Sequence, residues 1–345
     1  MRRRFGFAFL AVAAPAAAFA QARPLEALWY ARGAASTESF AAHADRVTIV
    51  SPQSFTLDST GMIHGSLDPR LVEVARARGV KLVPLVMNPG FDQPSIHRVL
   101  TNPAARAAAI ASLGRMCSAH RLDGIQFDIE NVHVSDKAAF TSFARDAAAV
   151  VHRAGCTLSA AVVPRTGEER GPTSYHQWIR DNWRGAYDYK ALAESLDFLS
   201  YMTYAQHTGN STPGPVAGYP WTEECLRYVL SLGVPPSKIS LGLAAYSDWW
   251  YPSYDDRSGP RPRGSDVSYA RAMEVAANSG VTPAWDPVQK ALFAQWEVAG
   301  VFEQVWVEDA RAFEAKLALV RKYGLRGYSV WKLGDEDPKT WDIVK

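Results

Sequence analysis

Hydrophobic and polar residues alternate most sharply over residues 122–131, which read LDGIQFDIEN. If this stretch is a β-strand, its side chains point alternately to two faces. One face is apolar and consists of Ile125, Phe127 and Ile129. The other is polar and consists of Gln126, Asp128 and Glu130. A strand at a solvent-exposed edge shows the same alternation, but helical patterns on both sides of this strand favour burial of both faces. Two carboxylates in a buried row are costly to desolvate, which favours a catalytic role.

Short apolar runs alternate with helical patterns along the rest of the chain, which predicts parallel βα units. The eight expected strands cover residues 25–30, 47–50, 80–86, 122–131, 157–163, 196–204, 239–246 and 327–331. The main helices between them are expected at residues 68–79, 102–120, 135–155, 222–232 and 309–323. Asp68-Pro69 and Asn102-Pro103 each supply an N-cap and a first-turn proline, and Ser135 is expected to cap a third helix. The pattern predicts an α/β fold of the (β/α)8 TIM barrel type, with its chemistry at the C-terminal ends of the strands.

The interval between the seventh and eighth strands is too long for a single crossover. Residues 249–306 are rich in aromatic residues, Pro, Gly and Arg, and a short helix is expected at 269–277. We expect a small insertion on the catalytic rim of the barrel. Its aromatic residues either contact the substrate or form a small core of the insertion: Trp249, Trp250, Tyr251 and Trp285.

Residues 1–22 have the pattern of a secretory signal peptide, with a basic start, an apolar middle and small residues before the cleavage site. The alternative, a membrane anchor, requires a longer apolar run. We therefore expect residues 23–345 to form the catalytic barrel of a secreted or periplasmic monomer. No membrane span is expected after removal of the signal.

The charge and the cysteines narrow the function classes further. The 345 residues carry a formal net charge of +2 without a basic stripe, which argues against nucleic acid as the main partner. Cys117 ends an expected helix and Cys156 immediately precedes an expected strand, so we expect these two to pair, leaving Cys225 over. No cysteine spacing indicates zinc, and neither a metal nor an organic cofactor is expected.

Asp128 and Glu130 lie two residues apart on one strand face, so their carboxyl groups are neighbours. Mutual repulsion should raise the pKa of one of them, and Glu130, at the outer end, is the candidate general acid. Two carboxylates on one strand do not flank a glycosidic bond from opposite sides, as the pairs of ordinary glycosidases do. If the protein is a glycosidase, the available nucleophile belongs to the substrate.

The segment from Asp123 to Glu130 resembles the DGxDxDxE signature of glycoside hydrolase family 18, the chitinase family. Asp123, Asp128 and Glu130 match the signature, and Glu130 falls where the proton donor of that family lies. Asp123 is expected to be structural. Gln126 departs from the Asp of most chitinases and is closest to the branch that contains di-N-acetylchitobiase and spore-cortex-type N-acetylglucosaminidases, which has a neutral amide there.

Further motifs extend the resemblance over most of the chain. Residues 197–204 resemble the sixth-strand Met-x-Tyr motif, in which Tyr204 would bind the acetamido oxygen of the substrate, although Ala205 replaces the Asp that often follows. Residues 327–331 resemble the eighth strand, whose Trp, here Trp331, forms the floor under the −1 sugar. The seventh strand, ending at Tyr246, is similar as well, and residues 57–61 and 308–311 look most like the spore-cortex branch.

The resemblance implies substrate-assisted catalysis with retention. Glu130 would protonate the leaving oxygen while the 2-acetamido carbonyl attacks the anomeric carbon. Asp128 would steady the N–H of the resulting oxazolinium ion, and Tyr204 would orient the carbonyl. The implied partner is a β-linked N-acetylglucosamine glycan, either peptidoglycan or chito-oligosaccharides.

Several residues are candidates for substrate binding: Gln126, Met202, Trp331, Tyr246, Gln206 and Trp29. Core packing is the alternative role for Met202 and Trp331, and an ordinary loop role is the alternative for Gln206 and its neighbour His207.

Two other functions compete with a glycosidase. A catalytically silent glycan-binding protein on the same scaffold usually lacks the acid, whereas Glu130 is present. A divalent-metal enzyme needs further carboxylates at adjacent strand ends, and Met87-Asn88 and Val163-Pro164 supply none.

Overall fold

The computed structural model describes residues 25–209, 211–255 and 259–344, so the expected signal peptide at 1–22 lies outside the described residues. A ring of parallel strands forms the centre of the molecule, and the last strand pairs with the first to close it. In order around the ring the strands are β1 (Glu26–Ala31), β2 (Ile49–Leu57), β5 (Leu85–Met87), β6 (Gly124–Asp128), β7 (Thr157–Val162), β8 (Leu199–Tyr201), β9 (Ile239–Ala244) and β15 (Gly327–Trp331). The predicted (β/α)8 barrel is therefore confirmed.

Several barrel strands are shorter or shifted relative to the expected ranges, and two differ in form. The third is broken into β4 (Lys81–Leu82) and β5, with Pro84 between them, because proline has no N–H to donate to the neighbouring strand. The second continues beyond the ring and pairs with the antiparallel β3 (Ile63–Gly65). Asp58 stabilises the turn of this hairpin by accepting hydrogen bonds from the backbone N–H groups of Thr60 and Met62.

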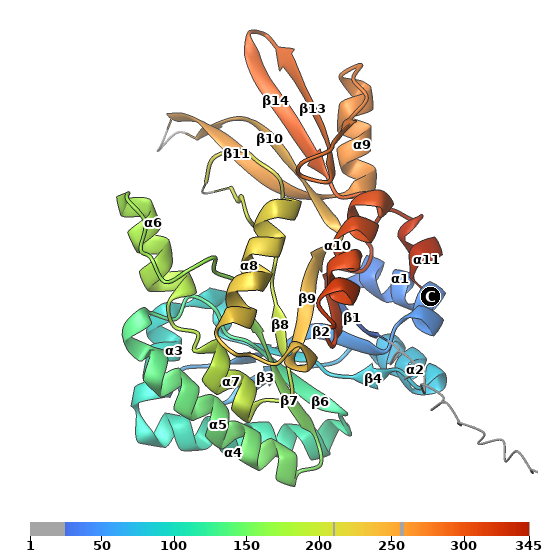
Figure 1. Cartoon of the computed structure of the whole chain (residues 1–345). Coiled ribbons are helices and arrows are strands. Elements are labelled where there is room, and N and C mark those ends of the chain that lie inside the picture. The colour runs from blue at the N-terminus through green and yellow to red at the C-terminus, as the bar shows by residue number, and fades with distance from the viewer. Residues whose placement is uncertain (1–24, 210, 256–258, 345) are drawn as a thin grey trace, which may run out of the picture.

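Helices surround the ring in Figure 1. They are α1 (Ala34–His43), α2 (Pro69–Arg78), α3 (Gln93–Thr101), α4 (Pro103–His120), α5 (Lys137–Arg153), α7 (Tyr189–Ser195), α8 (Tyr219–Ser231), α10 (Ala310–Lys322) and α11 (Thr340–Ile343). The side chains of Asp68 and Asn102 cap α2 and α4, each accepting from backbone N–H groups of the first turn. The prediction for Ser135 is wrong, because this residue lies inside a 3-10 turn (Val134–Asp136) whose cap is His133.

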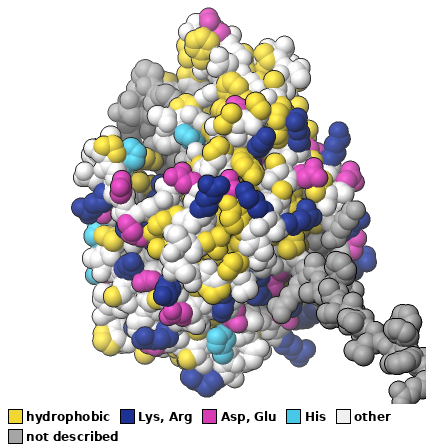
Figure 2. Space-filling model, in the orientation of Figure 1, with side chains coloured by type: hydrophobic (Ala, Val, Ile, Leu, Met, Phe, Trp, Pro, Cys, Tyr) yellow, Lys and Arg dark blue, Asp and Glu magenta, His cyan; other side chains and the backbone are white. Residues whose placement is uncertain are grey.

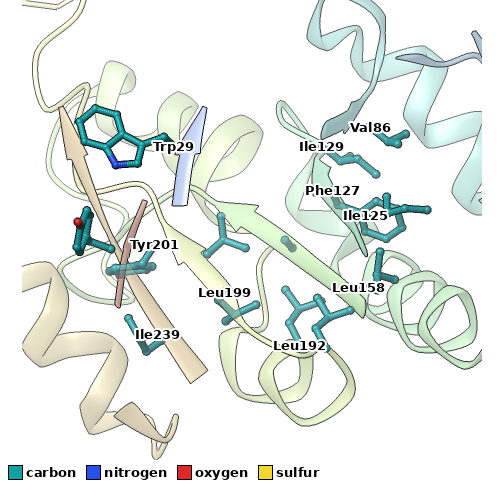
Figure 3. Packing of buried hydrophobic residues seen from close by; sticks show 14 of the residues in the cluster. Trp29, Val86, Ile125, Phe127, Ile129, Leu158, Leu192, Leu199, Tyr201 and Ile239 are labelled. Atoms are coloured by element: carbon teal, nitrogen blue, oxygen red, sulfur yellow. The ribbon is translucent and has the colours of Figure 1, made fainter. Parts of the chain in front are cut away.

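The apolar face of β6 packs outward against the helices. Ile125, Phe127 and Ile129 are fully buried, and Figure 3 shows them grouped with Val86 of β5 and Leu158 of β7. The Phe127 ring stacks on Phe143 of α5 at 5.6 Å between centroids. This packing turns the opposite, polar face of β6 toward the barrel interior.

A disulfide joins Cys117, near the end of α4, to Cys156, just before β7, with 6.2 Å between the Cα atoms. The pairing expected from the sequence is present. Cys225 of α8 is buried and carries a free thiol.

The segment between β9 and β15 contains a second, five-stranded antiparallel sheet. It lies above the barrel in Figure 1, together with α9 (Tyr269–Asn278). The strand order is β11 (Gly259–Ser268), β10 (Tyr246–Asp255), β14 (Val301–Val307), β13 (Ala291–Val298) and β12 (Ala284–Asp286). The sequence predicted only the helix here.

The aromatic residues of this second sheet serve its own packing. Trp250 is 2% exposed, and Trp249 lies against the small core formed by α9 and the strands. The Trp249 indole N–H donates to Glu303, and Arg311 of α10 lies over the Trp285 ring at 3.8 Å from its centroid. Of the two roles left open for these residues, packing within the insertion describes Trp249 and Trp250.

Basic and acidic side chains are interspersed over the face of the molecule that Figure 2 shows. Among the helices of the described residues, none is long and apolar enough to cross a bilayer.

Candidate active site

A cavity of about 390 Å³ opens at the C-terminal ends of the barrel strands. Its floor and walls come from the barrel: Tyr30, Gln53, Asp128, Glu130, Met202, Tyr204, Tyr246 and Trp331. The connection between β7 and α7 forms one side, and Asp266 of β11 reaches the rim from the second sheet. Six of the nine sequence candidates line this cavity: Asp128, Glu130, Met202, Tyr204, Tyr246 and Trp331.

Asp128 and Glu130 form a hydrogen-bonded carboxyl pair in this cavity. Asp128 is the last residue of β6 and is 4% exposed, and its carboxylate also accepts a hydrogen bond from the side chain of Gln53. Glu130 lies two residues further on and is partly buried. Its backbone is held on one side by Asn88, whose side chain bonds to both its N–H and its C=O, and on the other by Tyr187, whose hydroxyl donates to the Ile129 carbonyl at 2.9 Å.

The hydrogen bond between the two carboxyl groups requires a proton on one of them. Burial raises the pKa of Asp128 to about 6, partly offset by its hydrogen bonds from Gln53 and Glu130. Burial, and next the negative charge of Asp128, raise the pKa of Glu130 well above its ordinary value. Glu130 is therefore the member of the pair that favours the protonated form more strongly, and Asp128 is the member that ionises first. A protonated carboxyl beside an ionised one is the arrangement that general acid catalysis requires.

Tyrosine and tryptophan rings enclose the space next to this pair. Tyr204 follows β8, and its ring meets that of Tyr246 edge-on at 6.3 Å. Burial raises the pKa of the Tyr204 hydroxyl well above its ordinary value, so this hydroxyl stays a neutral hydrogen-bond donor. Trp331, the last residue of β15, packs against Tyr30 at 5.5 Å between ring centroids. An indole at a strand end presents a flat apolar surface on which a sugar ring can stack.

Gln126 lies beneath the cavity rather than in it. Its side chain is fully buried, accepts from the Tyr30 hydroxyl at 2.6 Å and donates to the hydroxyls of Ser159 and Ser200 at 3.0 and 3.1 Å. All of these partners are uncharged, so a neutral amide fits this layer where a carboxylate would need a compensating charge. Gln126 therefore orders the residues below the site and does not line the cavity.

Two other sequence candidates lie away from the cavity. Trp29 is fully buried on the outer side of β1 and stacks on Trp341 at 4.5 Å. Since side chains alternate along a strand, its neighbour Tyr30 is the residue of β1 that faces the barrel interior. Gln206 stabilises a loop, because its side-chain oxygen accepts from the Gly218 N–H at 2.8 Å. The assignments of Trp29 and Gln206 as substrate contacts are corrected accordingly.

An aromatic wall that the sequence did not predict lies on the side of the cavity formed by the β7–α7 connection. The short helix α6 (Ser174–Ile179) carries Tyr175 and Trp178, which are 39% and 46% exposed and lie 6.0 Å apart between ring centroids. Trp183 and Phe91 continue this wall and contact each other edge-on. The connection lacks a long periodic pattern, so only the i, i+3 spacing of Tyr175 and Trp178 signalled a shared helix face.

In the part of the chain that the structure describes, no group of three or more His, Cys, Asp or Glu side chains is arranged to hold a metal ion.

Comparison with known proteins places this site in a family context. Residues 46–337 match the family model described as Glycosyl hydrolases family 18. The cortical fragment-lytic enzyme of Bacillus subtilis is 31% identical over 222 residues, which are 64% of this chain and 48% of that protein. Rat di-N-acetylchitobiase is 25% identical over 298 residues, which are 79% of this chain and 75% of that protein. The chain thus spans about half the length of the first curated relative.

Solved structures share the fold. A chitinase from Chromobacterium violaceum superposes with a TM-score of 0.81 at 27% identity, covering 93% of this chain and 98% of its own. The Bacillus cereus spore cortex-lytic enzyme SleL has a TM-score of 0.82 at 23% identity, covering 94% of this chain and 74% of its own. At 23% identity, the similarity to SleL is evidence for a shared fold alone.

Proposed function

The chain belongs to glycosyl hydrolase family 18, and from this premise we propose that it is a retaining glycosidase. Its proposed substrates are β-linked N-acetylglucosamine glycans. The observation that carries the proposal is the hydrogen-bonded pair of Asp128 and Glu130 in the cavity, in which burial and the Asp128 charge raise the pKa of Glu130. The pair supplies an acid and a neighbouring anion from one side of the cavity. Because both groups come from the same strand, neither can attack the sugar from the side opposite the acid.

In the proposed reaction the substrate supplies the nucleophile. Glu130 donates its proton to the glycosidic oxygen, and that bond breaks as the 2-acetamido oxygen attacks the anomeric carbon. Asp128 accepts a hydrogen bond from the N–H of the oxazolinium ion, and the Tyr204 hydroxyl donates to the oxygen of the acetamido group. Water, giving a proton back to Glu130, then opens the ring on the face that the leaving group occupied, which retains the configuration.

Asp266 is the alternative source of a nucleophile. It is the third carboxyl group that lines the cavity, it is exposed, and it is hydrogen-bonded to Asp248 across the β10–β11 pair. Burial and the charge of Asp335 raise the pKa of Asp266, while its hydrogen bond with Asp248 and the charge of Lys332 lower it. Because Asp266 belongs to the second sheet and is already paired with Asp248, we favour attack by the substrate's own acetamido group.

We also propose an exported protein, secreted or periplasmic, that acts as a monomer. The Cys117–Cys156 disulfide supports this location, because disulfides form and persist in oxidising compartments. The names of the relatives point to two substrates, since one is called a cortical fragment-lytic enzyme and another a di-N-acetylchitobiase.

The test compares cleavage of chito-oligosaccharides with that of de-N-acetylated oligosaccharides of equal length. We expect turnover of the acetylated chains only, and competitive inhibition by a thiazoline analogue of the oxazolinium ion. Comparable rates on both substrates, abolished by Asp266→Asn, would show that a protein carboxylate attacks the sugar. Tight binding of the acetylated chain without any turnover would identify a catalytically silent glycan-binding protein.

A further inference from the structure

Four arginines lie in the β7–α7 connection, and three of them have acidic partners. Arg165 pairs with Glu168 at 3.2 Å, Arg170 with Asp181 at 2.6 Å and Arg180 also with Glu168 at 2.5 Å. The fourth is Arg184, and it has no ion pair among the described residues. It is the one of the four that lines the catalytic cavity.

Within the part of the chain that the structure describes, Arg184 combines an unpartnered, partly buried guanidinium with a backbone held in place by hydrogen bonds. Its Nε is buried and has no hydrogen-bond partner among the described residues, which is costly for a charged donor. Buried Nε atoms without partners occur in Arg165 and Arg180 as well, but both of these guanidinium groups pair with Glu168, whereas Arg184 has no such pair among the described residues. Its backbone is fixed, because the buried Arg165 donates from Nη1 to the Arg184 carbonyl at 3.1 Å and from Nη2 to the Tyr187 carbonyl at 3.1 Å. A fixed backbone and an unsatisfied guanidinium together describe a binding group held in place before its ligand arrives.

The acidic groups of the cavity do not neutralise this charge. The pKa values of Asp128 and Glu130 are set by burial, by Gln53 and by each other, with no contribution from Arg184. Arg32 also lines the cavity, just after β1, and forms no ion pair within the described part of the chain, but it is exposed and its charge is screened by solvent. Arg184 is therefore the partly buried cation available to the ligand.

From these contacts we infer that the cavity recognises a carboxylate carried by the glycan, and that Arg184 is the residue that binds it. This inference rests on the proposed function and narrows its substrate class to acidic glycans, such as those bearing a 3-O-lactyl group or an attached peptide. Arginine suits this task because its planar guanidinium can form two parallel hydrogen bonds to one carboxylate. Neutral chito-oligosaccharides lack this group.

The test measures binding in a Glu130→Gln background, so that no probe is hydrolysed. The probes are a peptide-free glycan of alternating N-acetylglucosamine and N-acetylmuramic acid, its methyl ester, and the same glycan with its peptides attached. Tryptophan fluorescence reports affinity, because Trp178, Trp183 and Trp331 line the cavity. We expect the acid to bind at least about tenfold more tightly than its ester.

Arg184→Gln should remove this preference, whereas the matched control Arg170→Gln should retain it, because Arg170 bonds to Asp181 outside the cavity. A preference for the peptide-free acid assigns the carboxylate to the lactyl group, and a preference seen only with peptides attached assigns it to the peptide; both support the inference. Equal affinities for all three probes, or a preference that survives Arg184→Gln, overturn it. If Arg184→Gln does not fold, the comparison of acid with ester in the Glu130→Gln protein decides alone.

The outcome is separable from that of the proposed function. A glycan that binds with the expected preference but is not cleaved by the unsubstituted protein contradicts the glycosidase and leaves the carboxylate site in place. Cleavage of all three glycans with equal kcat/KM, together with equal binding of all three, contradicts the carboxylate site and leaves the glycosidase in place.

Discussion

Asn88 holds the backbone of Glu130 by two hydrogen bonds. Its Oδ1 accepts from the Glu130 N–H at 3.1 Å, and its Nδ2 donates to the Glu130 carbonyl at 3.0 Å. Asn88 is fully buried at the end of β5, so this contact joins the third barrel strand to the loop that carries the acid. The position of Glu130 thus depends on a neighbouring strand as well as on β6.

Asn88→Ala should lower kcat more than it raises KM, because it leaves the peptide of Glu130 without two partners and releases the acid from its position. The lost hydrogen bonds should also lower the free energy of unfolding by about 1–3 kcal/mol. Asn102→Ala is the matched control, because it removes the N-cap of α4 and should lower the free energy of unfolding by a comparable amount, about 0.5–2 kcal/mol. Asn102 does not line the cavity. Equal effects of both variants on kcat would show that Asn88 acts through stability alone.

Glu130→Gln should reduce kcat by a factor on the order of 10² to 10⁴, because the amide cannot donate a proton to the leaving oxygen. Thermal unfolding and glycan binding should change little, since the amide has nearly the same shape. The measurement compares rates on an unactivated glycan and on a glycan with an acidic leaving group. The second should be affected less, because a good leaving group does not need a proton from Glu130. Near-normal turnover of the unactivated glycan would remove Glu130 from the mechanism.

The pH dependence of kcat should be bell-shaped. Asp128 must be ionised and Glu130 protonated, so activity should rise as the pH increases through about 6, the pKa to which burial raises Asp128. It should fall again as the pH passes the higher pKa of Glu130. Asp128→Asn removes a negative charge that raises the pKa of Glu130, so the descending limb of the residual activity should move to lower pH. A descending limb that stays in place would show that the two groups titrate independently.

Replacing both Cys117 and Cys156 by Ser should lower the free energy of unfolding by about 2–4 kcal/mol, because the unfolded chain loses a cross-link. Turnover at low temperature should persist, since Cys156 precedes β7 and the cavity lies at the opposite end of the strands. Reductant provides the control: it should lower the melting temperature of the unsubstituted protein to that of the variant and leave the variant unchanged. A variant with the original melting temperature would contradict the stabilising role.

The local patterns of the sequence determined the barrel and its acid. The alternation in β6, the caps at Asp68 and Asn102 and the apolar runs of the strands depend on neighbours within a few residues, so they can be recognised without knowing the fold. The same is true of the carboxyl pair, because side chains two residues apart on a strand share a face whatever surrounds them.

The tertiary structure alone decided which other residues reach the cavity. Trp29 and Tyr30 are adjacent aromatic residues, and the pairing of β1 with β2 and β15 is what directs Tyr30 inward and Trp29 outward. Asn88 and Arg184 owe their roles to partners distant in the chain, and the strands of the second sheet pair over similar distances. These contacts join residues that lie far apart in the sequence, and no local period encodes them. The sequence by itself therefore determined the fold and the carboxyl pair, and the tertiary structure determined what surrounds that pair.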